Sequence, residues 1–236
     1  MTPSFDLPRA ETQLEKLRVK GDVSSPKPGE AFLQLHPHGL AQLDCGFKMG
    51  FLFHKVYEQS CVPMGCSACF KIKAAPKTVA GLAALSGILE ALPHHAKCGL
   101  DFYNPHSRDI YAGFVYLSGL EAARQAYGPL RAAIDAHPDL GPSVRLTIKR
   151  GCSEHEAHCG PSDQWSFDPA MADFEAKARQ VYSPNRPDEL PLRLRKAAQM
   201  VKWIAFAYQM GDDSYLSLTG GKPLFAATVS YSPDGA

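Results

Sequence analysis

The sequence predicts a protein of the α+β class with a ferredoxin-like split βαββαβ core. Two observations carry this prediction. Between residues 69 and 149, segments with the two-residue period of a strand alternate with segments that have helical spacing, in the order βαββαβ. Right-handed crossovers then place the four strands in the spatial order 4-1-3-2. With 236 residues, 45% of them hydrophobic, the chain is long enough to bury such a core without covalent staples.

The first strand and the first helix have the clearest patterns. In residues 69–74, Phe70 and Ile72 alternate with Lys71 and Lys73, as in a strand with one buried face. In residues 79–92, leucines recur every three or four positions, and Pro93 ends the segment. These patterns predict one strand followed by one helix.

The remaining core elements follow without a break. Residues 98–103 and 110–117 read as two strands joined by the turn-rich segment NPHSRD. Ser118 and Glu121 form a capping-box pattern that predicts the start of the second helix. Residues 144–149 alternate again between apolar and polar side chains, which predicts the fourth strand.

Two extensions flank the core, which we place at residues 61–160, and the three parts are expected to form one compact unit. Residues 1–60 predict an irregular N-terminal extension that packs on the core. Residues 161–236 predict two helices and a hairpin: Asp168 and Pro169 begin the first helix, and residues 190–210 form the second. The hairpin is expected to turn near Gly220 and Gly221.

The charge, the hydropathy and the cysteine content of the chain limit the kinds of function that it can have. The formal net charge is +1, which argues against strong attraction of the whole chain to polyanions. No apolar run approaches the roughly 18 to 20 residues that cross a bilayer, and the first residues lack a signal core. We therefore expect a cytoplasmic protein with no membrane contact. In that reducing compartment, seven cysteines favour metal or redox chemistry over disulfides.

The cysteines fall into two groups that the predicted fold brings together. One group ends at the start of the first strand, and the other begins just after the fourth strand. These strands are antiparallel neighbours about 4.8 Å apart in a 4-1-3-2 sheet. The predicted metal ligands are Cys61, Cys66, Cys69 and Cys152. The reserve ligands are Cys159, His155 and His158, and either histidine is alternatively a hydrogen-bond partner of a thiolate.

The ligand type favours an iron–sulfur centre of open nuclearity over zinc. The spacing C-x4-C-x2-C followed by a distant cysteine resembles that of plant-type [2Fe-2S] proteins. Zinc sites more often use pairs of the C-x2-C type. The predicted function is electron transfer or redox catalysis with a redox partner protein. Buried cysteines also serve as small apolar residues, and we assign Cys45 and Cys98 to packing.

The alternative function is a nucleic-acid-binding or adaptor module that zinc stabilises. It rests on a basic sheet face, formed by Lys71, Lys73, Arg145 and Lys149, that resembles an RNA-recognition sheet. The near-neutral charge and Ala112, at a position where that motif has an aromatic residue, disfavour it. The chain has no phosphate loop, dinucleotide fingerprint, HExxH or GxSxG motif. The sequence therefore leaves open whether the protein is an enzyme and assigns no catalytic residue.

Overall fold

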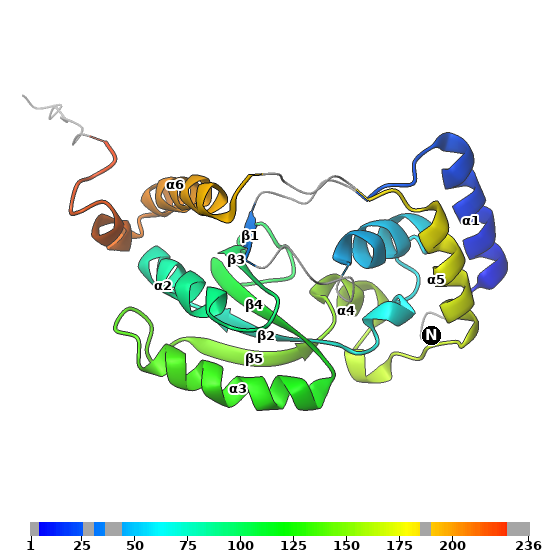
Figure 1. Cartoon of the computed structure of the whole chain (residues 1–236), viewed down its shortest axis with the longest axis horizontal. Coiled ribbons are helices and arrows are strands. Elements are labelled where there is room, and N and C mark those ends of the chain that lie inside the picture. Colours follow the sequence, from blue (N-terminus) through cyan, green and yellow to red (C-terminus); the bar gives the residue numbers. More distant parts are fainter. Residues whose placement is uncertain (1–4, 26–30, 36–43, 185–189, 226–236) are drawn as a thin grey trace, which may run out of the picture.

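The computed structural model describes residues 5–25, 31–35, 44–184 and 190–225. It combines helices with one antiparallel sheet, so the α+β class is confirmed. Figure 1 shows the sheet with α2 and α3 beside it, and α1 and α5 together at the opposite end of the molecule. The described helices include none that is both long enough and apolar enough to span a bilayer.

In the described part of the chain, the sheet has five strands in the order β1-β3-β4-β2-β5. Their bounds are Phe32–Gln34 (β1), Cys69–Ala75 (β2), Ala96–Leu100 (β3), Tyr111–Ser118 (β4) and Arg145–Arg150 (β5). The strand β2 lies between β4 and β5, with Ile72 opposite Val115 on one side and Ile148 on the other. Every pairing is antiparallel.

The edge strand β1 was not predicted, because residues 1–60 read as irregular. It pairs with β3, where Leu33 lies opposite Cys98. Gly99 permits this approach, since a Cβ atom at that position would lie 2.0 Å from the carbonyl oxygen of Ala31. Three residues are too few to show a period in the sequence, so only the partner strand reveals this element.

Two helices cover one face of the sheet and form the main core with it. They are α2 (Val79–Glu90) and α3 (Leu120–Asp135). Thr78 caps α2, because its hydroxyl accepts a hydrogen bond from the N–H of Gly81. Ser118 is not the cap of α3 as predicted: it is the last residue of β4 and pairs with Cys69.

The prediction of an irregular N-terminal extension is wrong. Residues Leu7–Lys20 form α1, and residues Gly46–Val56 form a π-helix, η1. Asp6 caps α1 by accepting a hydrogen bond from the N–H of Arg9. Pro8 lies in the first turn, where its missing N–H costs no hydrogen bond. The charged residue Asp6 and the proline Pro8, which looked like signs of irregular structure, therefore mark the start of a helix.

The C-terminal helices are present, but the predicted hairpin is wrong in its described half. The helices are α5 (Ala170–Val181) and α6 (Leu192–Met210). Asp213–Leu218 forms a 3-10 helix, η4, where the first hairpin strand was expected. Asp212 caps it through Ser214 and also accepts a hydrogen bond from the Tyr111 hydroxyl, which fixes the segment to the core. The second strand of that hairpin falls largely beyond residue 225, outside the described residues.

Candidate metal centre

The two cysteine segments meet at one end of the pair formed by β2 and β5. Cys69 is the first residue of β2, and Cys152 follows two residues after β5 ends. The backbone N–H of Gly151 donates a hydrogen bond of 2.8 Å to the carbonyl oxygen of Cys69. The strand pairing therefore places Cys152 beside the start of β2, although the two cysteines are far apart in the chain.

Arg150 ties the same two segments together. Its guanidinium donates to the carbonyl oxygens of Ser67, at 2.9 Å, and Ser162, at 2.8 Å. It also lies over the rings of Trp165 and Phe167, each 5.6 Å away. One side chain at the end of β5 thus holds the loop between Cys66 and Cys69 against the segment that follows α4 (Ser153–Cys159).

Gly151 makes the turn from β5 into α4. Its φ of +60° lies in the left-handed region that glycine adopts readily. A Cβ atom there would lie 2.6 Å from the Trp165 ring, so the close packing also requires glycine. Cys152 comes next, in an extended conformation at the N-cap of α4.

Cys66 lies among the other thiols of this region. Burial raises the pKa of its thiol well above the ordinary value. Three neighbouring thiols raise it further: Cys152, Cys69 and Cys45. Burial also raises the pKa of the Cys69 thiol, again with Cys152 as a neighbour. Cys45, Cys66, Cys69 and Cys152 thus form one electrostatic group, which we call the thiol cluster.

Cys45 is the member of this cluster that the sequence did not single out. The residue as a whole is exposed, but desolvation is still the main cause that raises its thiol pKa, followed by the charge of Cys152. It lies at the start of η1, where the Asp44 carboxylate accepts from the N–H of Phe47 and pairs with Arg179 on α5. These contacts fix the end of the helix that carries Cys45.

Cys61 occupies a different environment. Burial raises its pKa to about 12, and Cys159 and Glu175 are the charges that raise it further. No member of the thiol cluster is among the causes of its shift. The Cys159 thiol in turn donates to the carbonyl oxygen of Gln59 at 3.6 Å. Of the four predicted ligands, Cys69 and Cys152 act on the charge state of the Cys66 thiol together with Cys45, whereas Cys61 does not. Cys98 is fully buried in the main core, as a packing residue would be.

Lys71 makes a polar contact with the thiol cluster. Its ammonium donates a hydrogen bond of 3.0 Å to the sulfur of Cys152 and lies 5.2 Å from the centre of the Tyr116 ring. Only 6% of the residue is exposed. Burial lowers the pKa of Lys71, but the acidic groups around it, Cys152 first among them, raise it more, so the net direction is upward.

Lys97 brings a second cation to the same place. It lies 4.5 Å from the centre of the Phe32 ring and 5.9 Å from that of Tyr116. The described residues place no carboxylate within 4.0 Å of either the Lys71 or the Lys97 ammonium. A buried ammonium without a carboxylate needs another anion, because desolvation of an unpaired charge is costly. The acidic groups within reach are the Cys152 thiol, which is the main one beside Lys71, and the Tyr116 hydroxyl, which is the main one beside Lys97.

Of the two predicted histidines on α4, only His155 is buried. It is fully buried, packs against the rings of Phe53 and Trp165, and has no hydrogen-bond partner among the described residues on either ring nitrogen. Burial lowers its pKa to about 3, so the ring is neutral at pH 7. His158 is exposed.

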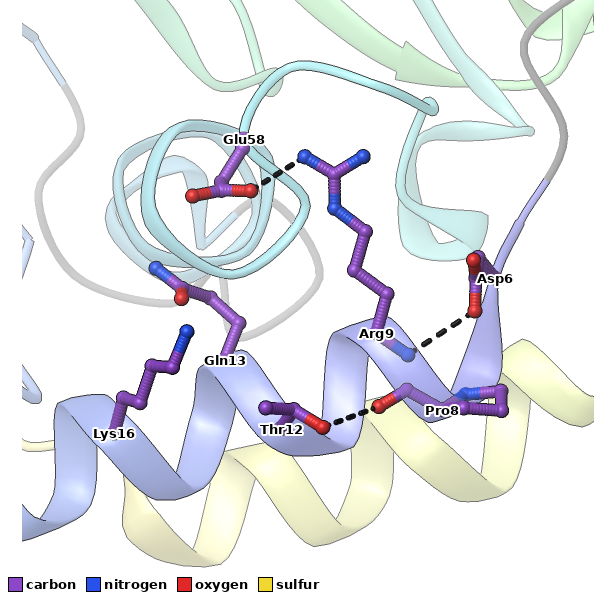
Figure 2. A pocket seen from close by; sticks show the side chains of 7 residues that line it. All are labelled: Asp6, Pro8, Arg9, Thr12, Gln13, Lys16 and Glu58. Atoms are coloured by element: carbon purple, nitrogen blue, oxygen red, sulfur yellow. Dashed lines mark hydrogen bonds and ion pairs between the residues drawn. The ribbon is translucent and has the colours of Figure 1, made fainter.

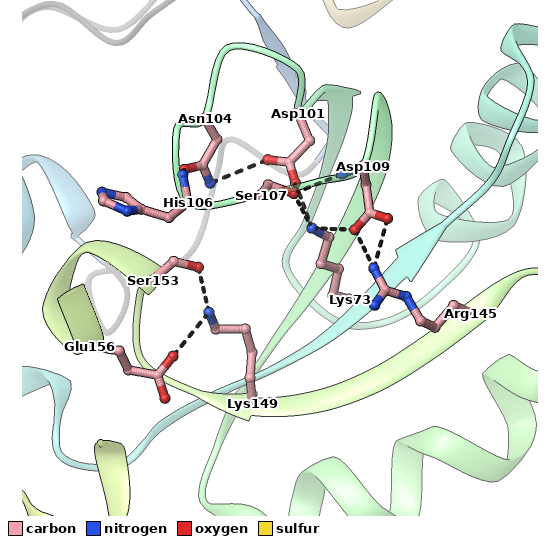
Figure 3. Close-up of polar contacts among 10 residues, drawn as sticks. All are labelled: Lys73, Asp101, Asn104, His106, Ser107, Asp109, Arg145, Lys149, Ser153 and Glu156. Atoms are coloured by element: carbon pink, nitrogen blue, oxygen red, sulfur yellow. Dashed lines mark hydrogen bonds and ion pairs between the residues drawn. The ribbon is translucent and has the colours of Figure 1, made fainter. Parts of the chain in front are cut away.

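The cations proposed for nucleic acid are largely neutralised within the protein. Figure 3 shows Lys73 paired with Asp101 and Asp109 at 2.5 and 2.7 Å. Arg145 binds both oxygens of Asp109, and Lys149 contacts Ser153 and Glu156. Lys71 is buried. These contacts leave little unpaired positive charge on this face for a phosphate backbone, which weighs against the alternative function.

Glu175 on α5 positions the loop that carries Cys66. Its carboxylate accepts hydrogen bonds from the backbone N–H groups of Met64 and Gly65 and from the hydroxyl of Tyr57. Burial raises the pKa of Glu175, and these donors oppose the rise. Nothing in the sequence marked this glutamate, because its partners lie more than 100 residues away.

The open pocket between α1 and the end of η1 has no matching chemistry. Figure 2 shows its lining, with the exposed ion pair between Arg9 and Glu58 at 2.6 Å and no cysteine or histidine. In the described part of the chain, no three Cys, His, Asp or Glu side chains meet closely enough to hold a single metal ion. The described residues therefore show no assembled single-ion site at the thiol cluster. Comparison with protein-family models, curated proteins and solved structures found no match.

Proposed function

We propose that the protein carries a polynuclear iron–sulfur cluster ligated by Cys45, Cys66, Cys69 and Cys152. The observation that carries this proposal is the buried Lys71 ammonium, which donates to the Cys152 sulfur with no carboxylate nearby among the described residues. Four thiolates outweigh the positive charge of an iron and sulfide core, so a ligated cluster is an anion. It supplies a negative charge beside Lys71, which has no carboxylate within 4.0 Å among the described residues.

The ligand type favours an iron–sulfur cluster over zinc in this proposal, because all four proposed ligands are thiols and iron–sulfur clusters are held by thiolates. Zinc sites more often use pairs of the C-x2-C type. The described cysteines do not converge on one point as a tetrahedral zinc site requires. The proposal therefore rests on the all-thiol ligand set and on the buried cation beside Cys152.

The chain topology supports the same location. We assign β2, α2, β3, β4, α3 and β5 to a ferredoxin-like unit, since β5, β2, β4 and β3 follow in that order across the sheet and β1 is added at the edge. In such a unit, the start of the first strand adjoins the end of the last. Cys69 and Cys152 occupy these two positions.

The proposed role is electron transfer with a redox partner protein. Four protein ligands leave no iron position open for a substrate, and Cys45 is exposed, which brings the cluster near the surface. Electron exchange needs proximity to a partner more than it needs a substrate pocket. The protein is proposed to act in the cytoplasm, where thiols stay reduced.

Anaerobic reconstitution tests both the cluster and its ligands. The wild-type protein is mixed with ferrous iron and sulfide, desalted, and assayed for bound iron, bound sulfide and visible absorbance. We expect coloured protein from wild type and Cys61→Ala, and colourless protein from Cys45→Ala and Cys152→Ala. Cys61→Ala is the matched control, because it removes a buried thiol that lies outside the cluster.

Two results would contradict the proposal. Wild-type protein that binds no sulfide, or that takes up only zinc, would exclude an iron–sulfur cluster. A coloured Cys45→Ala protein beside a colourless Cys61→Ala protein would overturn the ligand set proposed from the structure. Circular dichroism of each variant separates loss of a ligand from loss of the fold.

A further inference from the structure

We propose that an open pocket at the end of β2 binds a small organic phosphate, with Lys77, Arg108 and Arg145 as its cationic partners. The pocket has a volume of about 350 Å³, a size that suits a small ligand. It lies where Ala75, the last residue of β2, pairs with Arg145, whereas Cys69 begins the same strand at its other end. The site is therefore separate from the thiol cluster and does not depend on the proposed iron–sulfur cluster.

Three segments that are distant in the sequence each bring one cation to this pocket. Lys77 lies in the turn between β2 and α2, Arg108 lies in the loop between β3 and β4, and Arg145 is the first residue of β5. All three residues are exposed, so their charged groups are accessible to a ligand.

Asp109 is the acidic residue in the lining, and its charge is already paired within the protein. Figure 3 shows its carboxylate between Lys73, at 2.7 Å, and Arg145, which donates to both oxygens at 2.7 Å. Lys73 also pairs with Asp101, so two carboxylates balance these two cations. Both bonds from Arg145 start at Nη2, and its Nη1 and Nε have no partner among the described residues.

Lys77 and Arg108 give the pocket a surplus of positive charge. Neither has a carboxylate within 4.0 Å of its charged group among the described residues. The formal net charge of the whole chain is only +1, so two unpaired cations at one cavity are a local concentration of charge. A concave surface lined by one sign of charge attracts ligands of the opposite sign.

The pocket beside α1 lacks this surplus. Its lining contains two cations, Arg9 and Lys16, and two acidic residues, Asp6 and Glu58. Arg9 pairs with Glu58 at 2.6 Å. Charge therefore distinguishes the pocket at the end of β2 as the one that suits an anion.

A phosphate monoester matches this pocket in charge and in shape. It carries a charge of about −1.5 to −2 at pH 7, which offsets the two unpaired cations. Guanidinium groups bind phosphate oxygens through two parallel N–H bonds. Pro76 and Ile110 add apolar lining beside the cations, where the organic group of an ester can pack. Inorganic phosphate shares the charge but cannot use this apolar lining.

Isothermal titration calorimetry of the full chain tests the ligand class with three probes: phenyl phosphate, inorganic phosphate and succinate. The titrations are run in low salt at about pH 8, where a phosphate monoester is a dianion. We expect phenyl phosphate to bind about threefold more tightly than inorganic phosphate, because its ring can bury apolar surface. Succinate, a dianion without a phosphoryl group, should bind more weakly than both.

Two double variants test the residues. Lys77→Gln with Arg108→Gln should raise the Kd of phenyl phosphate about tenfold or more, because a charge-assisted hydrogen bond is lost at each position. Lys16→Gln with Arg124→Gln is the control with the same loss of charge at exposed residues outside the pocket. Its Kd should stay within about twofold of wild type, since salt screens distant charges.

Four results would overturn the proposal. Wild type that binds none of the probes has no such site, and equal weakening by both double variants would mean that binding follows overall charge. Equal affinity for succinate would exclude the phosphoryl group as the feature recognised, and equal affinity for inorganic phosphate would exclude the ester. If circular dichroism shows that the first double variant is unfolded, the single variants Lys77→Gln and Arg108→Gln replace it, each with an expected rise in Kd of about threefold. Uptake of iron and sulfide is measured separately, so failure of the proposed cluster would leave this site standing.

Discussion

The carboxylate of Glu175 accepts a hydrogen bond of 2.6 Å from the backbone N–H of Met64. The same carboxylate also binds the N–H of Gly65 and the hydroxyl of Tyr57. A side chain on α5 therefore holds the turn that leads into Cys66. The geometry of the proposed centre depends on this contact, although Glu175 is not a ligand.

Replacement of Glu175 tests this dependence. Glu175→Ala leaves the partly buried donors of Met64 and Tyr57 without an acceptor, so we expect a loss of about 2 to 4 kcal/mol in the free energy of unfolding. Glu175→Gln should lose less, because one amide oxygen still accepts. Urea unfolding of metal-free protein measures both changes, and reconstituted Glu175→Ala should bind less iron.

Glu11→Ala is the control for this series. Glu11 on α1 pairs with Lys177 on α5 over 3.9 Å, and both side chains are exposed. A surface pair of this kind contributes about 0 to 1 kcal/mol. Equal destabilisation by Glu175→Ala and Glu11→Ala would show that the hydrogen bonds to Met64 and Gly65 do not hold the loop.

Lys71 and Lys73 are neighbours on one strand face, but substitution by methionine should affect them differently. Lys71→Met removes a cation next to the Cys152 sulfur, so we expect the reduction equilibrium of the loaded protein to fall about tenfold or more. The metal-free protein should keep its stability, because methionine fills the buried site without a charge. Potentiometric titration and urea unfolding measure the two effects.

Lys73→Met should produce the opposite pattern. It leaves Asp101, which is 1% exposed, and Asp109 without their shared ammonium, so we expect a loss of about 3 kcal/mol or more in stability. Its potential should change little, since Lys73 contacts no cysteine among its described partners. An unchanged potential in Lys71→Met would contradict the proposed pairing of Lys71 with an anionic centre.

The sequence predicted those structural features that depend only on residues close together in the chain. Alternation in residues 69–74 and 144–149 predicted the strands β2 and β5, and their pairing brings Cys69 next to Cys152. The same alternation showed that Lys71 and Lys73 share a face. It could not show that Lys71 is buried and Lys73 is ion-paired, because those outcomes depend on distant segments that fold over the strand.

The spacing of the cysteines in the sequence could not predict that Cys45 belongs to the thiol cluster. Its place in the thiol cluster depends on how η1 packs against α5. Arg179 on α5 and Tyr182, which follows α5, determine that packing although they are distant in sequence. The Tyr182 hydroxyl would lie 2.9 Å from a Cβ atom at Gly46, and Arg179 pairs with Asp44. Conversely, Cys61 is close to Cys66 in sequence, but its neighbours are Cys159 and Glu175.

The buried Gly113 and the exposed Gly87 should respond to alanine in opposite directions. A Cβ atom at Gly113 on β4 would lie 2.6 and 2.7 Å from side-chain carbons of Leu89 and Leu85, so Gly113→Ala should destabilise by about 1 to 3 kcal/mol. Gly87 on α2 has open space, so Gly87→Ala should stabilise by about 0.5 to 1 kcal/mol. Thermal unfolding of both variants measures the difference, and a shift of the same sign in both would contradict the packing of α2 on β4.

The buried imidazole of His155 makes stability depend on pH. Burial, with smaller contributions from Lys71, His54 and Lys149, lowers its pKa to about 3 in the folded protein. An unfolded chain has a histidine pKa of about 6.5. Between these values the unfolded state binds the extra proton, so the free energy of unfolding falls as the pH drops. This contribution is fully present above about pH 6.5.

Urea unfolding of metal-free protein at pH 7 and pH 5 isolates this effect. The wild type should lose about 2 kcal/mol more than His155→Phe on going to pH 5, since each pH unit below the unfolded pKa costs about 1.4 kcal/mol for one proton. His158→Phe should follow the wild type, because His158 is exposed. If wild type and His155→Phe lost the same free energy, the folded protein would have to protonate His155 as readily as the unfolded chain does. The ring would then have access to water or a partner that its packing against Phe53 and Trp165 denies it.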